Sequence, residues 1–321
     1  MVFFIQQTMI FAIPLLIVAL AGAFAERSGI INIALDGIMI FGSFIGAVVV
    51  YHIQGAGNGP SGQWLYIIAM LASALAGGLF ALLLGFSAIT LKADQTIGGT
   101  ALNMLAPAIS LFLIKVVYGT NALRMHTGTV TEYMLHNQTG TFLDAFIDKA
   151  YISTYLMIAL FILLSVVLYK TKFGLRLRSC GEHPQAAASV GINVRKMRYM
   201  GTFISGALGG MGGYIYIATV TSGTAQGTVA GMGFLALAIM IFGNWKPLGI
   251  ALGSLLFGLL KCVSANYNML DINADGVALL SKLGLPSYFY NILPYVAVLV
   301  VLAFTSKNSR APKAEGIPYD G

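Results

Sequence analysis

Residues able to do covalent or metal chemistry are few in this sequence, and their spacing is unsuitable for it. There are two cysteines and four histidines, with no CxxC pair, HExxH motif, GxSxG motif or phosphate-binding Gly-x-x-x-x-Gly-Lys motif. His183 has no second residue at metal-ligand spacing. We therefore expect no catalytic residue, no metal site and no cofactor bound by this chain. A membrane-embedded enzyme, which needs paired acids or a histidine cluster, is disfavoured for the same reason.

The segment FGLRLRSCGEHPQAAASVGINVRKMR, residues 173–198, surrounds a run of alanines with positive charge. Residues 170–198 hold seven of the eighteen Lys and Arg residues and one acid, Glu182. Pro184 suits a first helical turn and Gly191 suits a C-terminal cap, which predicts a helix of about two turns. Such a helix is too short to be stable alone.

We expect this short helix to dock into a groove on another protein through its small residues, Ala186 to Ser189, while the flanking arginines stay near anionic lipid headgroups. The alternative is an ordinary cytoplasmic loop whose positive charge only sets membrane orientation.

Asn103 lies inside a long apolar segment, where a polar group is costly and a functional role is the first hypothesis. It follows Thr96 and Thr100 in a glycine-rich stretch that can interrupt a helix. Its amide both donates and accepts, which suits the hydroxyls of a sugar or the edge of a base. The alternative is a hydrogen bond that only holds two helices together.

Four further residues in apolar segments are candidates for a solute pathway or for ordinary packing. Met104 and Phe234 can line an apolar passage, although such residues in membrane helices usually pack. Asn32 and Asp36 are candidates for a gate or for structural contacts near the end of their segment.

The composition defines the elements that must position these residues. The chain has 321 residues, of which 58% are hydrophobic, and its mean hydropathy is +0.84. Its net charge of +7 comes from basic residues next to apolar segments, which indicates membrane orientation and no nucleic-acid partner. The predicted fold is all-α, a polytopic helical bundle with nine spans at residues 5–25, 30–51, 64–91, 97–118, 150–169, 198–218, 226–243, 246–266 and 287–305.

The charge pattern also predicts the topology. The basic loop at residues 170–198 and the tail with Lys307, Arg310 and Lys313 are separated by four predicted spans, so both face the cytoplasm. The N-terminus then lies outside. We expect one transmembrane domain at residues 1–305 and a cytoplasmic tail at residues 306–321, disordered from Asn308 onward.

Small residues recur inside the predicted spans, as at Ser205, Gly209 and Gly213. One face of small residues lets helices approach closely in lipid, so we expect packing within the chain, with a dimer seam as the alternative.

Four motifs in order along the chain resemble the permeases of ATP-binding-cassette importers of the ribose and branched-chain amino acid type. They are the segment at 173–198 ending in Gly-Ile-Asn-Val, ERSGIINIALDGIMIFGSFIGA, GTALNMLAPAISLFLIKVVYG and GNWKPLGIALGSLLFGLL. Among these, the sequence most resembles the permeases of nucleoside importers in a bacterial cell membrane. Ribose permeases have one more N-terminal span than this chain.

The resemblance implies partners and a role for the basic loop. The partners are a second permease in a heterodimer, an ATPase with two nucleotide-binding cassettes that carries the ATP and magnesium, and a substrate-binding lipoprotein. The resemblance assigns the coupling helix, which fits a cleft on the ATPase, to seven residues: Gly181, Glu182, His183, Pro184, Gln185, Ala186 and Ala187.

The competing class is a secondary transporter or channel driven by an ion gradient. Such a protein normally shows intramembrane acids or an inverted repeat. Asp36 is the one acid clearly inside a predicted span, and no repeat is visible.

Overall fold

The computed structural model describes residues 2–55, 61–125, 150–268, 286–305 and 311–319, in which helices dominate. The long helices are α1 (Val2–Glu26), α2 (Leu35–Gly55), α3 (Gly62–Gly85), α4 (Gln95–Tyr118), α7 (Ile152–Lys170), α10 (Val194–Thr219), α12 (Pro247–Asn266) and α13 (Ser287–Thr305). The short elements are η1 (Phe86–Thr90), α8 (Lys172–Glu182), α9 (Pro184–Ser189), α11 (Met232–Phe242) and the antiparallel pair β1 (Leu123–Arg124) and β2 (Thr224–Ala225).

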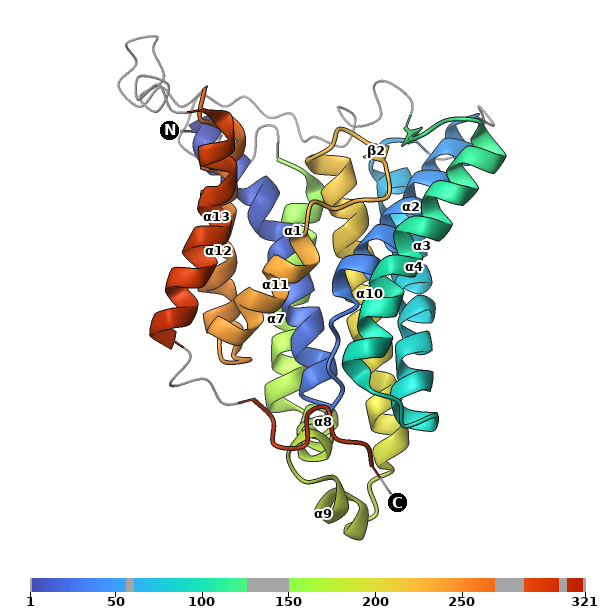
Figure 1. The fold of residues 1–321 in the computed structure, drawn as a ribbon, viewed down its shortest axis with the longest axis vertical. Helices are drawn as coiled ribbons and strands as arrows, with labels where there is room; N and C mark the ends of the chain where they lie inside the picture. Colours follow the sequence, from blue (N-terminus) through green and yellow to red (C-terminus); the bar gives the residue numbers. More distant parts are fainter. Residues whose placement is uncertain (1, 56–60, 126–149, 269–285, 306–310, 320–321) are drawn as a thin grey trace.

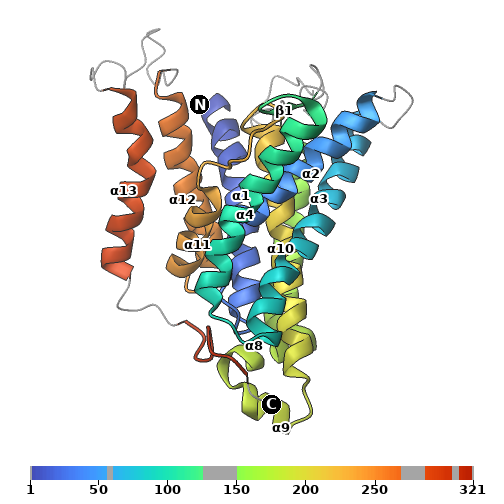
Figure 2. The ribbon, with the colours of Figure 1, turned by 45° about the vertical axis from the view of Figure 1, so that its right-hand side comes forward.

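The long helices run along one axis of the molecule. Helices α8 and α9 and the C-terminus lie at one end, which we call the α9 end, and the N-terminus lies at the other (Figure 1). Helices α12 and α13 form the edge opposite α2 and α3 (Figure 2). The predicted basic loop and residues 311–319 of the predicted tail are therefore at the same end of the bundle.

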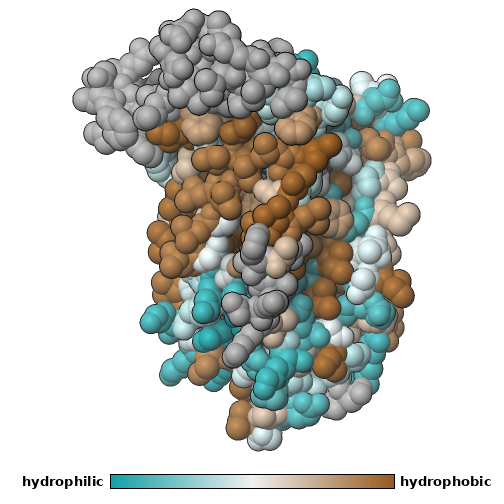
Figure 3. All heavy atoms as spheres, turned by 60° about the vertical axis from the view of Figure 1, so that its left-hand side comes forward, coloured by the Kyte–Doolittle hydropathy of each residue, from teal (hydrophilic) through white to brown (hydrophobic). Residues whose placement is uncertain are grey.

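The outer surface suits a lipid environment. Leucines along α3 and α12, including Leu75, Leu79 and Leu252, are more than half exposed. On one face, hydrophobic side chains gather over the upper part and hydrophilic ones toward the α9 end (Figure 3). Among the described residues, six helices are long and apolar enough to cross a membrane: α1, α2, α3 with η1, α4, α7 and α12.

Two of the nine predicted spans are helical over only part of their predicted length. The segment predicted to span from residue 30 is helical only from Leu35, and the segment predicted from residue 226 is helical only from Met232 and has eleven helical residues. Both segments enter the bundle as non-helical chain and become helical part-way along its axis (Figure 1). Glycines at Gly29 and Gly231 adopt left-handed backbone angles before them.

Helix α10 is the centre of the packing and contacts α1, α2 and α3. A Cβ on Gly210 would lie 2.2 Å from the Ser73 carbonyl oxygen of α3, and one on Gly213 would lie 2.0 Å from that of Met39 in α2. Ser205 binds Asn32, and Gly209 faces Ile38. The small-residue face of α10 therefore packs within this chain, as predicted, because no side chain separates the backbones.

Candidate functional site

The starts of α2 and α11 meet inside the bundle, at a place we call the mid-bundle junction (Ile33–Gly37, Asn103 and Ala230–Phe234). A Cβ on Gly233 would lie 2.4 Å from the Asp36 Cα, so the two helix starts are in direct contact. The first N–H groups of any helix lack partners within it. In lipid such groups must be satisfied by protein.

Asn103 of α4 satisfies the start of α2. Its Oδ1 accepts a hydrogen bond from the Gly37 N–H at 2.7 Å, and its Nδ2 donates to the Ile33 carbonyl at 2.9 Å. Both polar groups of the side chain thus have protein partners. This geometry matches the interhelical alternative for Asn103, and its contact with a solute stays a prediction.

Asp36 of α2 satisfies the start of α11 in the same way. Its Oδ1 accepts from the Gly233 N–H at 2.9 Å, and the Phe234 N–H also bonds to it. A carboxylate at a helix N-terminus is favoured by the partial positive charge there. Asp36 is therefore an N-cap supplied by a neighbouring helix.

The link from Arg27 to Ala34 is satisfied by other parts of the chain. The Ile31 N–H donates to Oε1 of Gln95 on α4 at 2.7 Å, and Nδ2 of Asn32 donates to Oγ of Ser205 at 2.8 Å. Asn32 is fully buried, so this contact is structural. The first turn of the link is a helix C-cap, in which the Ile30 N–H donates to the Ala25 carbonyl at 3.1 Å.

The other predicted pathway residues are exposed in this chain. Thr96, Thr100 and Met104 lie one turn apart on one outward face of α4, and Met104 is 77% exposed. Phe234 is 50% exposed and follows the contact of Gly233 with Asp36. The structure thus brings Asn103, Asp36 and Phe234 together, with the two threonines extending from them toward the α9 end.

The seven predicted coupling residues divide into three groups. Helix α9 begins at Pro184, as predicted, and Gly191 has a left-handed φ of 83° after it. Pro184 and Ala187 are buried in this chain, whereas His183, Gln185 and Ala186 are exposed. The expectation that Ala187 faces outward is wrong.

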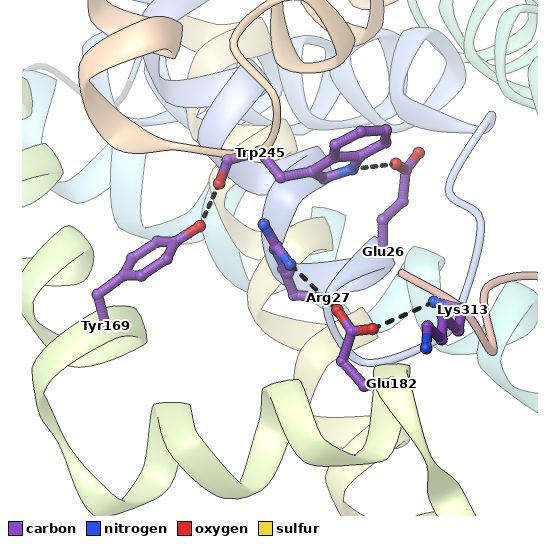
Figure 4. A network of polar contacts seen from close by, with 6 residues as sticks. All are labelled: Glu26, Arg27, Tyr169, Glu182, Trp245 and Lys313. Atoms are coloured by element: carbon purple, nitrogen blue, oxygen red, sulfur yellow. Dashed lines mark hydrogen bonds and ion pairs between the residues drawn. The ribbon is translucent and has the colours of Figure 1, made fainter. Parts of the chain in front are cut away.

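Gly181 and Glu182 contact the link and the C-terminus of the same chain. A Cβ on Gly181 would lie 2.4 Å from the Arg27 carbonyl oxygen. Figure 4 shows Glu182 between Arg27, which it meets at 3.4 Å, and the Lys313 N–H, at 3.5 Å. In the same network Trp245 Nε1 donates to the Glu26 carboxylate at 2.6 Å, and the Tyr169 hydroxyl donates to the Trp245 carbonyl.

The C-terminal segment, residues 311–319, packs against the α9 end, so the prediction of disorder from Asn308 is wrong for these residues. The Ala314 N–H donates to the Gly181 carbonyl at 2.8 Å, and the Gly316 N–H donates to the Gly29 carbonyl at 3.2 Å. Arg198, predicted to lie near lipid headgroups, is 1% exposed and donates to the Ile317 carbonyl at 2.9 Å.

Glu315 places a carboxyl group beside the end of α1. Burial raises the pKa of Glu315 to about 7, although its hydrogen bond with Glu26 and the charge of Arg27 act in the opposite direction. The docked segment therefore holds a proton at pH values where a free glutamate has lost it.

Sequence reasoning missed several residues that hold these contacts, among them Gln95, Arg198, Trp245 and Glu315. Their partners are distant in sequence, so spacing could not reveal them. The available signal for the C-terminal segment was Tyr319, which is partly buried and packs against the core although it lies in a polar tail.

Long apolar helices packed in one bundle are typical of a multi-pass membrane protein. Residues 4–303 match the family described as the branched-chain amino acid transport system permease component. The chain therefore belongs to this family of ATP-binding-cassette permeases, and it is a transport subunit without catalytic activity of its own. The family implies an ATPase and a second permease as partners.

Relatives match over nearly the full chain. The guanosine ABC transporter permease protein NupQ of Bacillus subtilis is 37% identical over 98% of this chain and 95% of its own length. The nucleoside ABC transporter permease protein NupC of Lactococcus lactis is 38% identical over 98% of this chain and 96% of its own. The guanosine permease protein NupP of Bacillus subtilis is 24% identical over 94% of this chain and 81% of its own. No solved structure matches significantly.

Replacing Asn103 by Ala should destabilise the fold by about 1–3 kcal/mol, because the Gly37 N–H loses its acceptor inside the bundle. The melting temperature in detergent and the rate of uptake in vesicles should then both decrease. Val116→Ala on the same helix is the matched control, since this exposed side chain, which lies outside the predicted pathway, should leave unfolding and uptake unchanged. A normal melting temperature for Asn103→Ala with altered uptake would instead support solute contact.

The docking of the C-terminal segment should weaken as the pH rises. Docked Glu315 keeps its proton up to a pKa of about 7 and the undocked group releases it near 4.5, so the docked state binds more protons between these values and loses stability across this window. Trypsin cleavage after Lys313 should increase between about pH 6 and pH 8 more in the wild type than in Glu315→Gln, which has no proton to lose. Identical pH profiles for the two proteins would contradict this assignment.

Proposed function

We propose that this chain is a transmembrane subunit of an importer for nucleosides. It would pair with a second permease, be driven by an ATPase with two nucleotide-binding cassettes, and receive its solute from an extracellular binding lipoprotein. The observation that carries the proposal is near full-length similarity to permeases named for guanosine and nucleoside transport. The similarity of a second Bacillus permease supports a pair of unequal subunits.

We also propose nine membrane crossings, with the N-terminus outside and the α9 end in the cytoplasm. Six crossings are the long apolar helices, and α10, α13 and the segment ending in α11 provide the other three. The basic residues near the α9 end support this orientation, because Lys and Arg are enriched in cytoplasmic loops.

The ATPase contact in this proposal is the outward side of α9. His183, Gln185 and Ala186 are exposed there and available to a partner, whereas Pro184 and Ala187 fix α9 to its own chain. Gly181 and Glu182 connect the helix to the link and to the C-terminal segment. A displacement of α9 by the ATPase would therefore act on the start of α2.

The solute pathway in this proposal follows the outward face of α4 toward the mid-bundle junction. Thr96 and Thr100 offer hydroxyls, and Met104 and Phe234 offer apolar surface for a base. Interrupted helices with their starts inside the membrane are typical of solute sites in transporters. Asn103 and Asp36 would hold this geometry through their backbone contacts.

Reconstitution with the co-purifying subunits tests the proposed substrate. ATP-dependent uptake should be found for nucleosides and not for ribose or branched-chain amino acids, in a panel that includes all three. ATP-dependent uptake of a sugar or an amino acid without nucleoside uptake would reject the nucleoside assignment.

Ala186→Arg should prevent association with the ATPase, because a long cation replaces a methyl group on the outward side of α9. Co-purification of the ATPase should be lost while membrane insertion and thermal stability are kept. The control is Asn121→Arg, an exposed position on the connection between α4 and β1. Unchanged association in Ala186→Arg would reject the proposed contact.

A further inference from the structure

We infer that the C-terminal segment, residues 311–319, is a coupling element that transmits movement of α8 and α9 to the link between α1 and α2. The inference depends on the proposed contact of α9 with the ATPase. It gives a mechanical role to the part of the chain that charge and composition mark as an unstructured tail.

The segment is bound at one side to the end of α8. The Ala314 N–H donates to the Gly181 carbonyl at 2.8 Å, in the last turn of α8. The Lys313 N–H lies 3.5 Å from a carboxylate oxygen of Glu182 (Figure 4). The side chains of Pro312 and Ala314 are buried, so the segment packs as well as hydrogen-bonds.

Two residues further along, the same segment is bound to the link. The Gly316 N–H donates to the Gly29 carbonyl at 3.2 Å. Gly316 has a left-handed φ of 75°, and a Cβ there would lie 2.8 Å from Cδ1 of Ile31. A side chain at residue 316 would therefore be strained by its backbone angle, and the end of the Ile31 side chain would have to move away from it.

Arg198 holds the segment from the side of α10. Its guanidinium donates to the Ile317 carbonyl at 2.9 Å, and its Nη2 would lie 2.9 Å from a Cβ on Gly29. This charged side chain is 1% exposed, so its carbonyl partner in the segment offsets part of the cost of burying it. Arg198 is thus a positioning residue that binds the segment and borders the link.

The link continues directly into the mid-bundle junction. Past the bound residues Gly29 and Ile31, it carries Ile33, which Asn103 binds, and then the first turn of α2. A displacement of Gly181 therefore reaches α2 by two routes in parallel. One is the contact of α8 with Arg27, and the other is the C-terminal segment.

The inference predicts a loss of coupling without a loss of assembly. In the reconstituted complex, deletion of residues 311–321 should keep the ATPase bound and hydrolysing ATP, while the solute imported per ATP falls about five- to tenfold, the lower range for coupling between sites. Gly316→Val should reproduce this effect within the full-length chain. A chain lacking only residues 320 and 321 is the matched control.

Three outcomes would overturn the inference. These are an unchanged ratio of import to hydrolysis in both variants, loss of the bound ATPase, or loss of the folded permease in Gly316→Val. Absence of ATP-dependent uptake in the intact complex is a different result, since it rejects the proposed function before the segment is tested. Arg198→Met removes the donor to the Ile317 carbonyl, whereas Arg198→Lys keeps a donor at this position. A ratio of import to hydrolysis that falls in Arg198→Met and is retained in Arg198→Lys would show that the hydrogen bond is required, and not only the filling of space.

Discussion

A polypeptide that leaves helical geometry inside a bilayer must find partners for its backbone groups within the protein. In the described part of the chain, non-helical backbone enters the helical bundle between Arg27 and Ala34 and again before Met232. Side chains from other helices provide the partners: Gln95 and Asn103 of α4 bind the first interruption, and Asp36 of α2 binds the start of α11. Polar residues that look like solute contacts in the sequence are here part of the scaffold.

The need to satisfy these backbone groups also connects the C-terminal segment at the α9 end with the mid-bundle junction. Near the α9 end, the Gly29 carbonyl of the link between α1 and α2 accepts a hydrogen bond from the Gly316 N–H of the C-terminal segment. The link continues into α2. There, Ile33 accepts a hydrogen bond from Asn103, and Asp36 accepts one from Gly233 at the start of α11. Helix α10 supports the whole path, since its glycines let α2 and α3 approach its backbone and its Ser205 and Arg198 bind the link and the segment.

Local patterns predicted part of this structure well. Apolar length placed most helices, Pro184 and Gly191 bracketed α9, and the small residues of α10 marked a packing face. Hydropathy could not detect the interruptions before Leu35 and Met232, because non-helical chain buried in protein can be as apolar as a helix. The C-terminal segment was mistaken because its burial depends on contacts between residues more than a hundred positions apart, such as Arg198 with Ile317. Ala187 was mistaken because α9 packs on α8 and α10 of its own chain, which the alanine run by itself does not reveal.

The central claim is that α9 and the C-terminal segment behave as one body during transport. Both native cysteines are buried, so spin labels can be placed at Val190, directly after α9, and at Ile317, which are exposed. Double electron–electron resonance on the reconstituted complex should give one narrow distance distribution, unchanged between the ATP-free and ATP-trapped states. A distance that broadens or lengthens in either state would show that the segment separates from α9, and would contradict the account.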